Sequence, residues 1–134
     1  MSGPLRPVPD PDSARYWESL GDHALELQRC ADCGAWRWPP RAICGVCGSF
    51  AQTWERCSEA GTVESWVVNH HRFSRAFETP YTVVLGRLDV QPDVCLPAIW
   101  AEPSVPSTGQ AIRLDYRDGS DADGPLTVPI WRAG

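Results

Sequence analysis

The chain has 134 residues and a mass of 14.8 kDa, the size of one ordinary domain or two very small ones. Its 43% hydrophobic and 22% charged residues match globular averages and argue against disorder of the whole chain. The net charge is −5 and every basic residue is arginine, which disfavours general nucleic-acid binding because that affinity depends on phosphate neutralisation. No apolar run reaches the roughly 18 residues of a membrane span, and no apolar signal segment follows the N-terminus. We therefore expect a cytoplasmic protein without a membrane partner.

The N-terminal segment, residues 1–11, contains four prolines and is predicted to be an extended arm, because proline lacks an amide donor and fixes φ. Asp12 or Ser13 can then cap a short helix that stops near Gly21.

The helix carries an apolar face of Tyr16, Trp17 and Leu20 at helical spacing. Eight residues do not form a stable helix alone, so this face must pack against something. Packing on the chain's own ribbon or barrel is slightly favoured, and contact with another subunit is the alternative.

Four of the six cysteines form two Cys-x-x-Cys pairs, Cys30–Cys33 and Cys44–Cys47, with ten residues between them. Two residues between ligands allow one tight turn to present both sulfur atoms to a tetrahedral ion. Glycine follows each pair, where a positive φ lets backbone amides turn toward the thiolates. The spacing predicts a four-thiolate metal site.

The preferred metal is zinc, although a closed four-cysteine site also fits a rubredoxin-type iron centre. A short ribbon commonly needs a structural zinc ion to fold, and four protein ligands leave no position for water. We expect a structural role for the metal.

The two remaining cysteines, Cys57 and Cys95, are predicted to be buried small apolar residues. A thiol nucleophile would need a nearby base, and His70-His71 is the candidate pair. Neighbouring residues on a strand point to opposite faces, so at most one of them could face a given cysteine. We assign no catalytic residue.

The C-terminal part contains five β-rich runs separated by turn-rich segments. This pattern favours a five-stranded, partly open barrel of the OB type, with a small sandwich as the alternative. The acidic segment 118–124 is predicted to be a solvated loop. The predicted organisation is an arm (1–11), a helix with a metal ribbon (12–57) and a barrel (58–134).

The run from Leu25 to Phe50, with the Tyr-Trp helix before it and GTVESW after it, resembles a known family. Its members are acyl-CoA-associated proteins that join a rubredoxin-like zinc ribbon to an OB fold, long catalogued as a domain of unknown function. The resemblance extends from Asp12 to Trp131 and includes Pro39-Pro40-Arg41 between the cysteine pairs. It implies a mainly β fold with a short N-terminal helix, a rubredoxin-like zinc ribbon and a five-stranded OB-fold barrel. It also implies structural zinc on Cys30, Cys33, Cys44 and Cys47.

The family resemblance also implies a role. Similar proteins are companions of thiolase-superfamily enzymes, including acetoacetyl-CoA thiolases and lipid-transfer-protein-like aldolases of steroid side-chain degradation. In some relatives the module is fused behind a hydratase-like domain. The chain is thus expected to be a non-catalytic accessory subunit that shapes the acyl-CoA channel of a thiolase-fold partner. A two-plus-two hetero-oligomer with a CoA thioester at the interface is expected.

Two aromatic segments are candidates for that interface. Trp36 and Trp38 would share one face of a rigid tip, with Arg37 opposite, and tryptophan and arginine are enriched at interface hot spots. An equally good interpretation is that both rings cover the ribbon's own metal core.

The second segment, residues 70–81, interleaves arginines with aromatic rings, a pattern that can hold CoA phosphates and cover an acyl chain or adenine. The same pattern is at least as compatible with a solvated loop that contributes a few rings to the core. The candidate interface or CoA-binding residues are Tyr16, Trp17, Trp36, Arg37, Trp38, Arg41, Arg72, Phe73, Arg75 and Phe77.

Two other functions remain as alternatives from the residues alone. Zinc ribbons and OB folds also bind single-stranded nucleic acid, and Trp66 or Phe73 could stack on bases, although the acidic balance opposes this. Iron in the thiolate site would instead make a redox protein.

Overall fold

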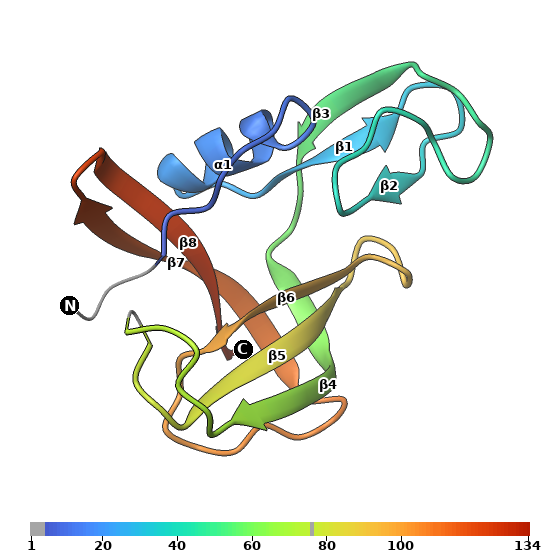
Figure 1. Ribbon diagram of the computed structural model, residues 1–134. Coiled ribbons are helices and arrows are strands. Elements are labelled where there is room, and N and C mark those ends of the chain that lie inside the picture. The colour runs from blue at the N-terminus through green and yellow to red at the C-terminus, as the bar shows by residue number, and fades with distance from the viewer. Residues whose placement is uncertain (1–4, 76) are drawn as a thin grey trace.

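The computed structural model describes residues 5–75 and 77–134, so the first four residues of the predicted arm lie outside the described part. One helix is followed by a three-stranded sheet and a closed five-stranded barrel. Figure 1 shows the helix and the small sheet above one end of the barrel. The predicted fold class, mainly β with a short N-terminal helix, a zinc-ribbon region and a five-stranded barrel, is confirmed. No helix in the described ranges is long and apolar enough to cross a membrane.

The helix, α1, spans Ala14–Gly21. Ser13 occupies the N-cap position, as one of the two predicted caps, but its side chain makes no capping bond to the helix. Instead, the Asp10 carboxylate accepts a bond from the Ser13 amide at 2.7 Å, and the Asp10 amide donates to Ser13 Oγ at 3.1 Å. This reciprocal pair fixes the turn before the helix.

The apolar face of α1 packs on the chain's own sheet and barrel, the favoured of the two predicted arrangements. Tyr16 and Leu20 are buried, and the helix contacts strands β1 (Glu26–Cys30) and β8 (Gly124–Ala133). Ser19 supports the junction, because its hydroxyl donates to Tyr16 O at 2.7 Å and accepts from the Glu26 amide at 3.3 Å.

The small sheet consists of β1 (Glu26–Cys30), β2 (Trp36–Arg37) and β3 (Gln52–Arg56). β1 is central and antiparallel to both neighbours. Successive residues of a strand point to opposite faces, so Leu27 and Arg29 lie on one face while Gln28 and Cys30 lie on the other. One face therefore meets the helix, and the other carries the first metal ligand.

The barrel contains β4 (Ala60–Asn69), β5 (Tyr81–Leu88), β6 (Cys95–Trp100), β7 (Ala111–Asp121) and β8 (Gly124–Ala133), in the order β4-β5-β6-β8-β7. The β6–β8 pair is parallel and the others are antiparallel. The strands β4 and β7 close the barrel through only three residue pairs, at Ala60–Thr62. The OB-type barrel, rather than a sandwich, is the observed architecture.

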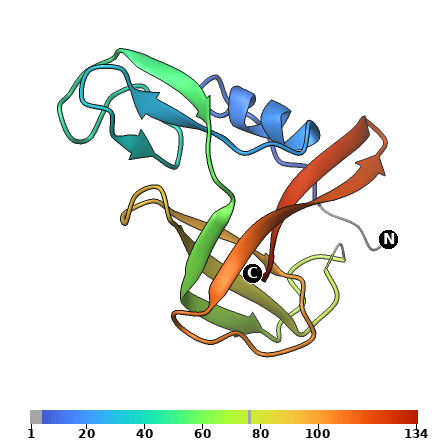
Figure 2. The same cartoon turned by 180° about the vertical axis from the view of Figure 1, so that it is seen from behind.

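The acidic segment 118–124 is a hairpin, not the loop that the sequence predicted. The β7–β8 ladder continues to Asp121 opposite Gly124, whose φ of +114° suits glycine in the turn. Arg6 of the N-terminal arm binds both carboxylate oxygens of Asp121, at 2.6 and 2.7 Å. Figure 2 shows this hairpin rising beside α1. Partners distant in sequence thus stabilise a strand of loop-like composition.

The core is continuous from the helix through the ribbon into the barrel. Trp131 is fully buried at its centre, and its indole nitrogen donates to Leu96 O at 2.9 Å. Gly86 lies under that ring, since a Cβ there would be 2.3 Å from Trp131 Cζ2. The barrel is therefore filled by side chains.

Candidate functional site

Two turns of the same design hold the four paired cysteines. Gly34 N donates to Cys30 O at 3.0 Å, and Gly48 N donates to Cys44 O at 2.9 Å. Both glycines adopt the left-handed conformation, with φ of +79° and +77°. Each Cys-x-x-Cys-Gly segment therefore forms a compact knuckle that presents its sulfur atoms toward the other.

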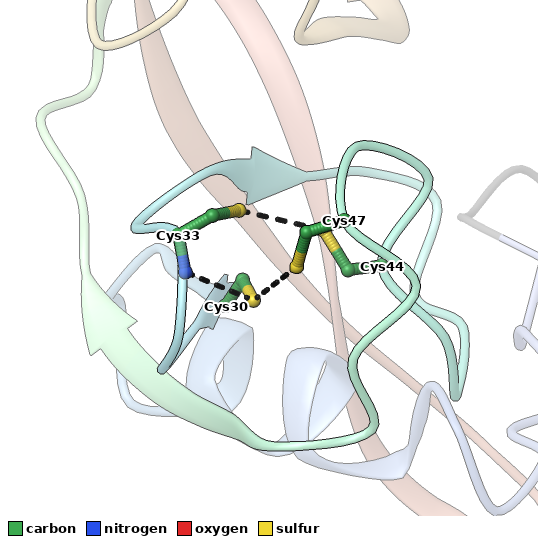
Figure 3. A group of neighbouring side chains, drawn as sticks. All are labelled: Cys30, Cys33, Cys44 and Cys47. Carbon is green, nitrogen blue, oxygen red and sulfur yellow. Dashed lines mark hydrogen bonds between the residues drawn. The ribbon is translucent and has the colours of Figure 1, made fainter.

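The four sulfur atoms converge on one point (Figure 3). All lie within 4.8 Å of one another, with 3.6 Å between the Sγ atoms of Cys30 and Cys47 and 3.7 Å between those of Cys33 and Cys44. A tetrahedron with metal–sulfur bonds of about 2.3 Å has edges of about 3.8 Å, whereas a disulfide needs about 2.05 Å. The geometry fits a tetrahedral ion and does not fit disulfides.

Backbone amides prepare two of these thiols for ionisation. The Cys33 amide donates to Cys30 Sγ at 3.4 Å and lowers the pKa of Cys30. Amides of Cys47 and Val46 lower the pKa of Cys44 to about 6. Because the thiolate is the metal-binding form, these contacts favour the ionised form of Cys30 and Cys44, whereas the neighbouring thiols raise the pKa of Cys33 and Cys47.

The donor set fits zinc in a structural role. Cys30, Cys33, Cys44 and Cys47 would hold the ion, and a four-thiolate shell stabilises the fold by tying the two knuckles together. Such an ion supplies binding free energy to folding, because the site cannot exist in the unfolded chain.

The predicted aromatic tip covers the chain's own interior more than it projects from it. Trp36 and Trp38 are half-buried against the core, and Trp38 meets Tyr16 edge to face at 6.0 Å. Tyr16 and Arg37 are buried, so neither offers accessible surface of this chain to a partner. Contact by this region with another subunit stays a prediction for the exposed parts of the two tryptophans.

The remaining candidates are more accessible. Trp17 is half-buried in a groove of about 500 Å³ between α1, the N-terminal arm and the β7–β8 hairpin. Arg41 is exposed on the segment between the knuckles, and its amide donates to Gln28 Oε1 at 2.8 Å.

The arginine–aromatic segment forms an exposed loop after β4. Phe73 is 77% exposed, and Arg72 donates to Arg75 O at 3.2 Å. Phe77 packs on Tyr81 with ring centroids 5.2 Å apart. The structure thus gathers these four candidates on one loop, which Figures 1 and 2 show on the side of the barrel away from the ribbon.

Two glutamines have positions that sequence reasoning missed. The Gln91 side chain, in the β5–β6 loop, accepts a hydrogen bond from Trp36 N and donates one to Trp36 O, both at 2.8 Å. It therefore links strand β2 of the ribbon to the barrel. No local pattern could reveal a contact across 55 residues. Gln28 is buried beside Arg37, and alternation along β1 could have placed it on the face of Cys30.

The two single cysteines behave differently. Cys57 is buried as predicted, and burial raises the pKa of its thiol to about 11, which disfavours a thiolate nucleophile. Cys95 is only half-buried, because it begins β6.

Fold and site together define a class of protein: a four-cysteine zinc ribbon joined to an OB-type barrel. The family described as "ChsH2, rubredoxin-like zinc ribbon domain" matches residues 17–52. A solved chain of the Ltp2-ChsH2(DUF35) aldolase has a TM-score of 0.83 and 33% sequence identity, covering 96% of this chain and 98% of that one. A DUF35-family protein of unknown function from Sulfolobus solfataricus has a TM-score of 0.62 at 15% identity, covering 92% and 86%, and shows the fold alone.

Two curated relatives are larger proteins. A probable enoyl-CoA hydratase alpha subunit of Thermomonospora curvata is 36% identical over 129 residues, which cover 95% of this chain and 39% of the relative. The 3-oxo-4,17-pregnadiene-20-carboxyl-CoA hydratase alpha subunit of Mycobacterium tuberculosis is 29% identical over 117 residues, covering 87% and 37%. The chain therefore spans less than two fifths of either relative. The chain belongs to the ChsH2/DUF35 family of zinc-ribbon and OB-fold proteins.

Proposed function

We propose that this chain is an accessory subunit of an acyl-CoA-processing complex whose bond-making groups reside on a thiolase-fold partner. The observation that carries the proposal is the likeness over nearly the whole of both chains to the DUF35 part of an aldolase complex. Both curated relatives are also named as alpha subunits of enzymes that act on CoA thioesters. An acyl-CoA aldolase partner is favoured, and a bulky steroid side-chain substrate is the first to test.

The chain's own chemistry agrees with an accessory role. Its clustered thiols suit a closed structural metal site, and Cys57 is held as a neutral thiol. The role is therefore positional: the chain would orient the acyl-CoA and exclude water while the partner performs the reaction.

We propose that the partner-facing and CoA-facing surface lies on loop 70–80, of which residues 70–75 and 77–80 are described, and on the adjoining half of β4. Val67 and Val68 are 62% and 39% exposed, and Phe73 is 77% exposed. In the part of the chain that is described, Ser65–Asn69 pairs with β5 and leaves its other edge open. Arg72 and Arg75 are exposed beside these apolar groups, where they can bind CoA phosphates.

The test is co-expression of this chain with a thiolase-superfamily enzyme from the same genome, followed by size exclusion, zinc analysis and an acyl-CoA cleavage assay. We expect a stable two-plus-two complex that is active, and little or no activity of the partner alone. Equal partner activity with and without the chain, or turnover by the chain alone, would refute the proposal.

A further inference from the structure

Arg37 is a buried cation that has no carboxylate partner among the described residues. Arg37 is only 4% exposed, and both of the side chains that it binds are neutral amides. Nε donates to Gln28 Oε1 at 2.9 Å, Nη2 donates to Gln52 Oε1, and Nη1 has no hydrogen-bond partner. Burying a charge is costly unless another charge compensates it.

The strand register places Arg37 on the face of the sheet that carries Cys30. Arg37 lies opposite Gln28 in the β2–β1 pair, and Gln52 lies opposite Cys30 in the β3–β1 pair. Gln28 and Cys30 are two residues apart on β1 and share one face of the sheet. A side chain that leaves Arg37 and binds both glutamines must therefore cross β1 on the face that carries Cys30.

The segment between the knuckles closes over the same place. The Arg41 amide donates to Gln28 Oε1, three residues before the second knuckle begins at Cys44. The guanidinium is thus enclosed between the sheet and the loop that delivers the other pair of ligands, which explains its burial.

The geometry points to Arg37 as the buried counter-cation of the metal–thiolate centre, a positioning residue that strengthens metal retention. Four thiolates around a divalent ion leave a net charge of −2. Arginine stays protonated even when buried, and two glutamine amides orient it without neutralising it. Its positive charge therefore remains available to the centre. Outer partners of this kind typically change metal affinity by about 10- to 100-fold.

The experiment compares Arg37→Gln, which removes the charge, with Arg37→Lys, which keeps a charge but cannot bind both glutamines in the same way. Arg117→Gln, an exposed arginine of β7, is the matched control for loss of one charge. Zinc is titrated into metal-free protein in a zinc buffer, and ribbon folding is followed by tryptophan fluorescence. A variant that is unfolded without zinc is measured equally well, because binding and folding are coupled.

We expect Arg37→Gln to raise the zinc concentration at half-maximal folding by about 10- to 100-fold, Arg37→Lys to raise it less, and Arg117→Gln to leave it unchanged. Equal shifts for the lysine and glutamine variants would assign Arg37 a purely structural bridging role and overturn the inference. Unchanged zinc binding in Arg37→Gln, or an equal shift in Arg117→Gln, would overturn it as well.

Discussion

At the level of single residues, Gly86 is one of the tightest points of the barrel. A methyl group there would lie 2.3 and 2.5 Å from two ring atoms of Trp131 and 3.0 Å from Ile112 Cδ1. Both neighbours are buried, so neither can move into open space. We expect Gly86→Ala to lower the free energy of unfolding by about 3 kcal/mol, the upper part of the range for overpacking a core.

Urea unfolding measures this effect, with Gly21→Ala as the matched control. Nothing lies within 4 Å of a Cβ at Gly21, the last residue of α1. Alanine has the higher helix propensity, so the control should be neutral or slightly stabilised. Equal stability of the two variants would contradict the packing argument.

The cysteine centre could be predicted from the sequence because its determinants are local. Two residues between ligands and a following glycine define each knuckle within five positions. Arg37 could not be placed in the same way. Alternation correctly set it opposite Trp36 and Trp38, but its burial depends on Gln28, Gln52 and the covering loop, which are brought to it only by the folded ribbon.

At the level of elements, the strands were predictable from alternation and the barrel closure was not. The five β-rich runs became β4 to β8, but composition cannot specify the parallel β6–β8 pair or the short β4–β7 contact. The hairpin tip was missed because Asp, Gly and Ser are typical of loops. Its ladder depends on contacts with Arg6 and His23, which lie more than 90 residues away.

Three carboxylates of β7 make the hairpin sensitive to acid. A hydrogen bond from Arg132 lowers the pKa of Asp115, one from Thr127 and then His23 lowers that of Asp118, and one from Arg6 lowers that of Asp121. Carboxyl groups with lowered pKa values stabilise the folded state above their ordinary pKa of about 3.9. This stabilisation is lost as the pH falls through the lowered values.

We therefore expect the melting temperature to be steady near neutrality and to fall below about pH 4. Melting curves between pH 7 and pH 2 test this. Asp121→Asn should melt lower at neutral pH and show a shallower fall, since it removes one of the three titrating groups. A variant with the full acid response would assign the loss to other carboxylates or to protonation of the metal-binding thiolates.

At the level of the whole molecule, the helix, ribbon and barrel share one core. Leu20 and Leu27 belong to the same buried cluster as Trp131 of the barrel. The division of the chain at residues 57 and 58 stays a prediction, and the shared core argues that both parts respond together to metal removal. Gln91 adds a direct hydrogen-bonded link between them.

Two exposed phenylalanines, one in the loop after β4 and one in the ribbon, allow the partner-facing surface to be located. Phe73 lies on the loop after β4 and is 77% exposed, whereas Phe50 follows the second knuckle and is 73% exposed. Truncating an exposed ring removes few contacts within the isolated chain. The free energies of unfolding of Phe73→Ala and Phe50→Ala should therefore both lie within about 0.5 kcal/mol of the wild-type value.

If loop 70–80 contacts the partner, Phe73→Ala should weaken association by about 2 kcal/mol, or roughly 30-fold in Kd, as for a central aromatic hot spot. Phe50→Ala should leave association unchanged. Surface plasmon resonance with the co-purified partner measures both constants, and the reverse order would move the interface to the ribbon.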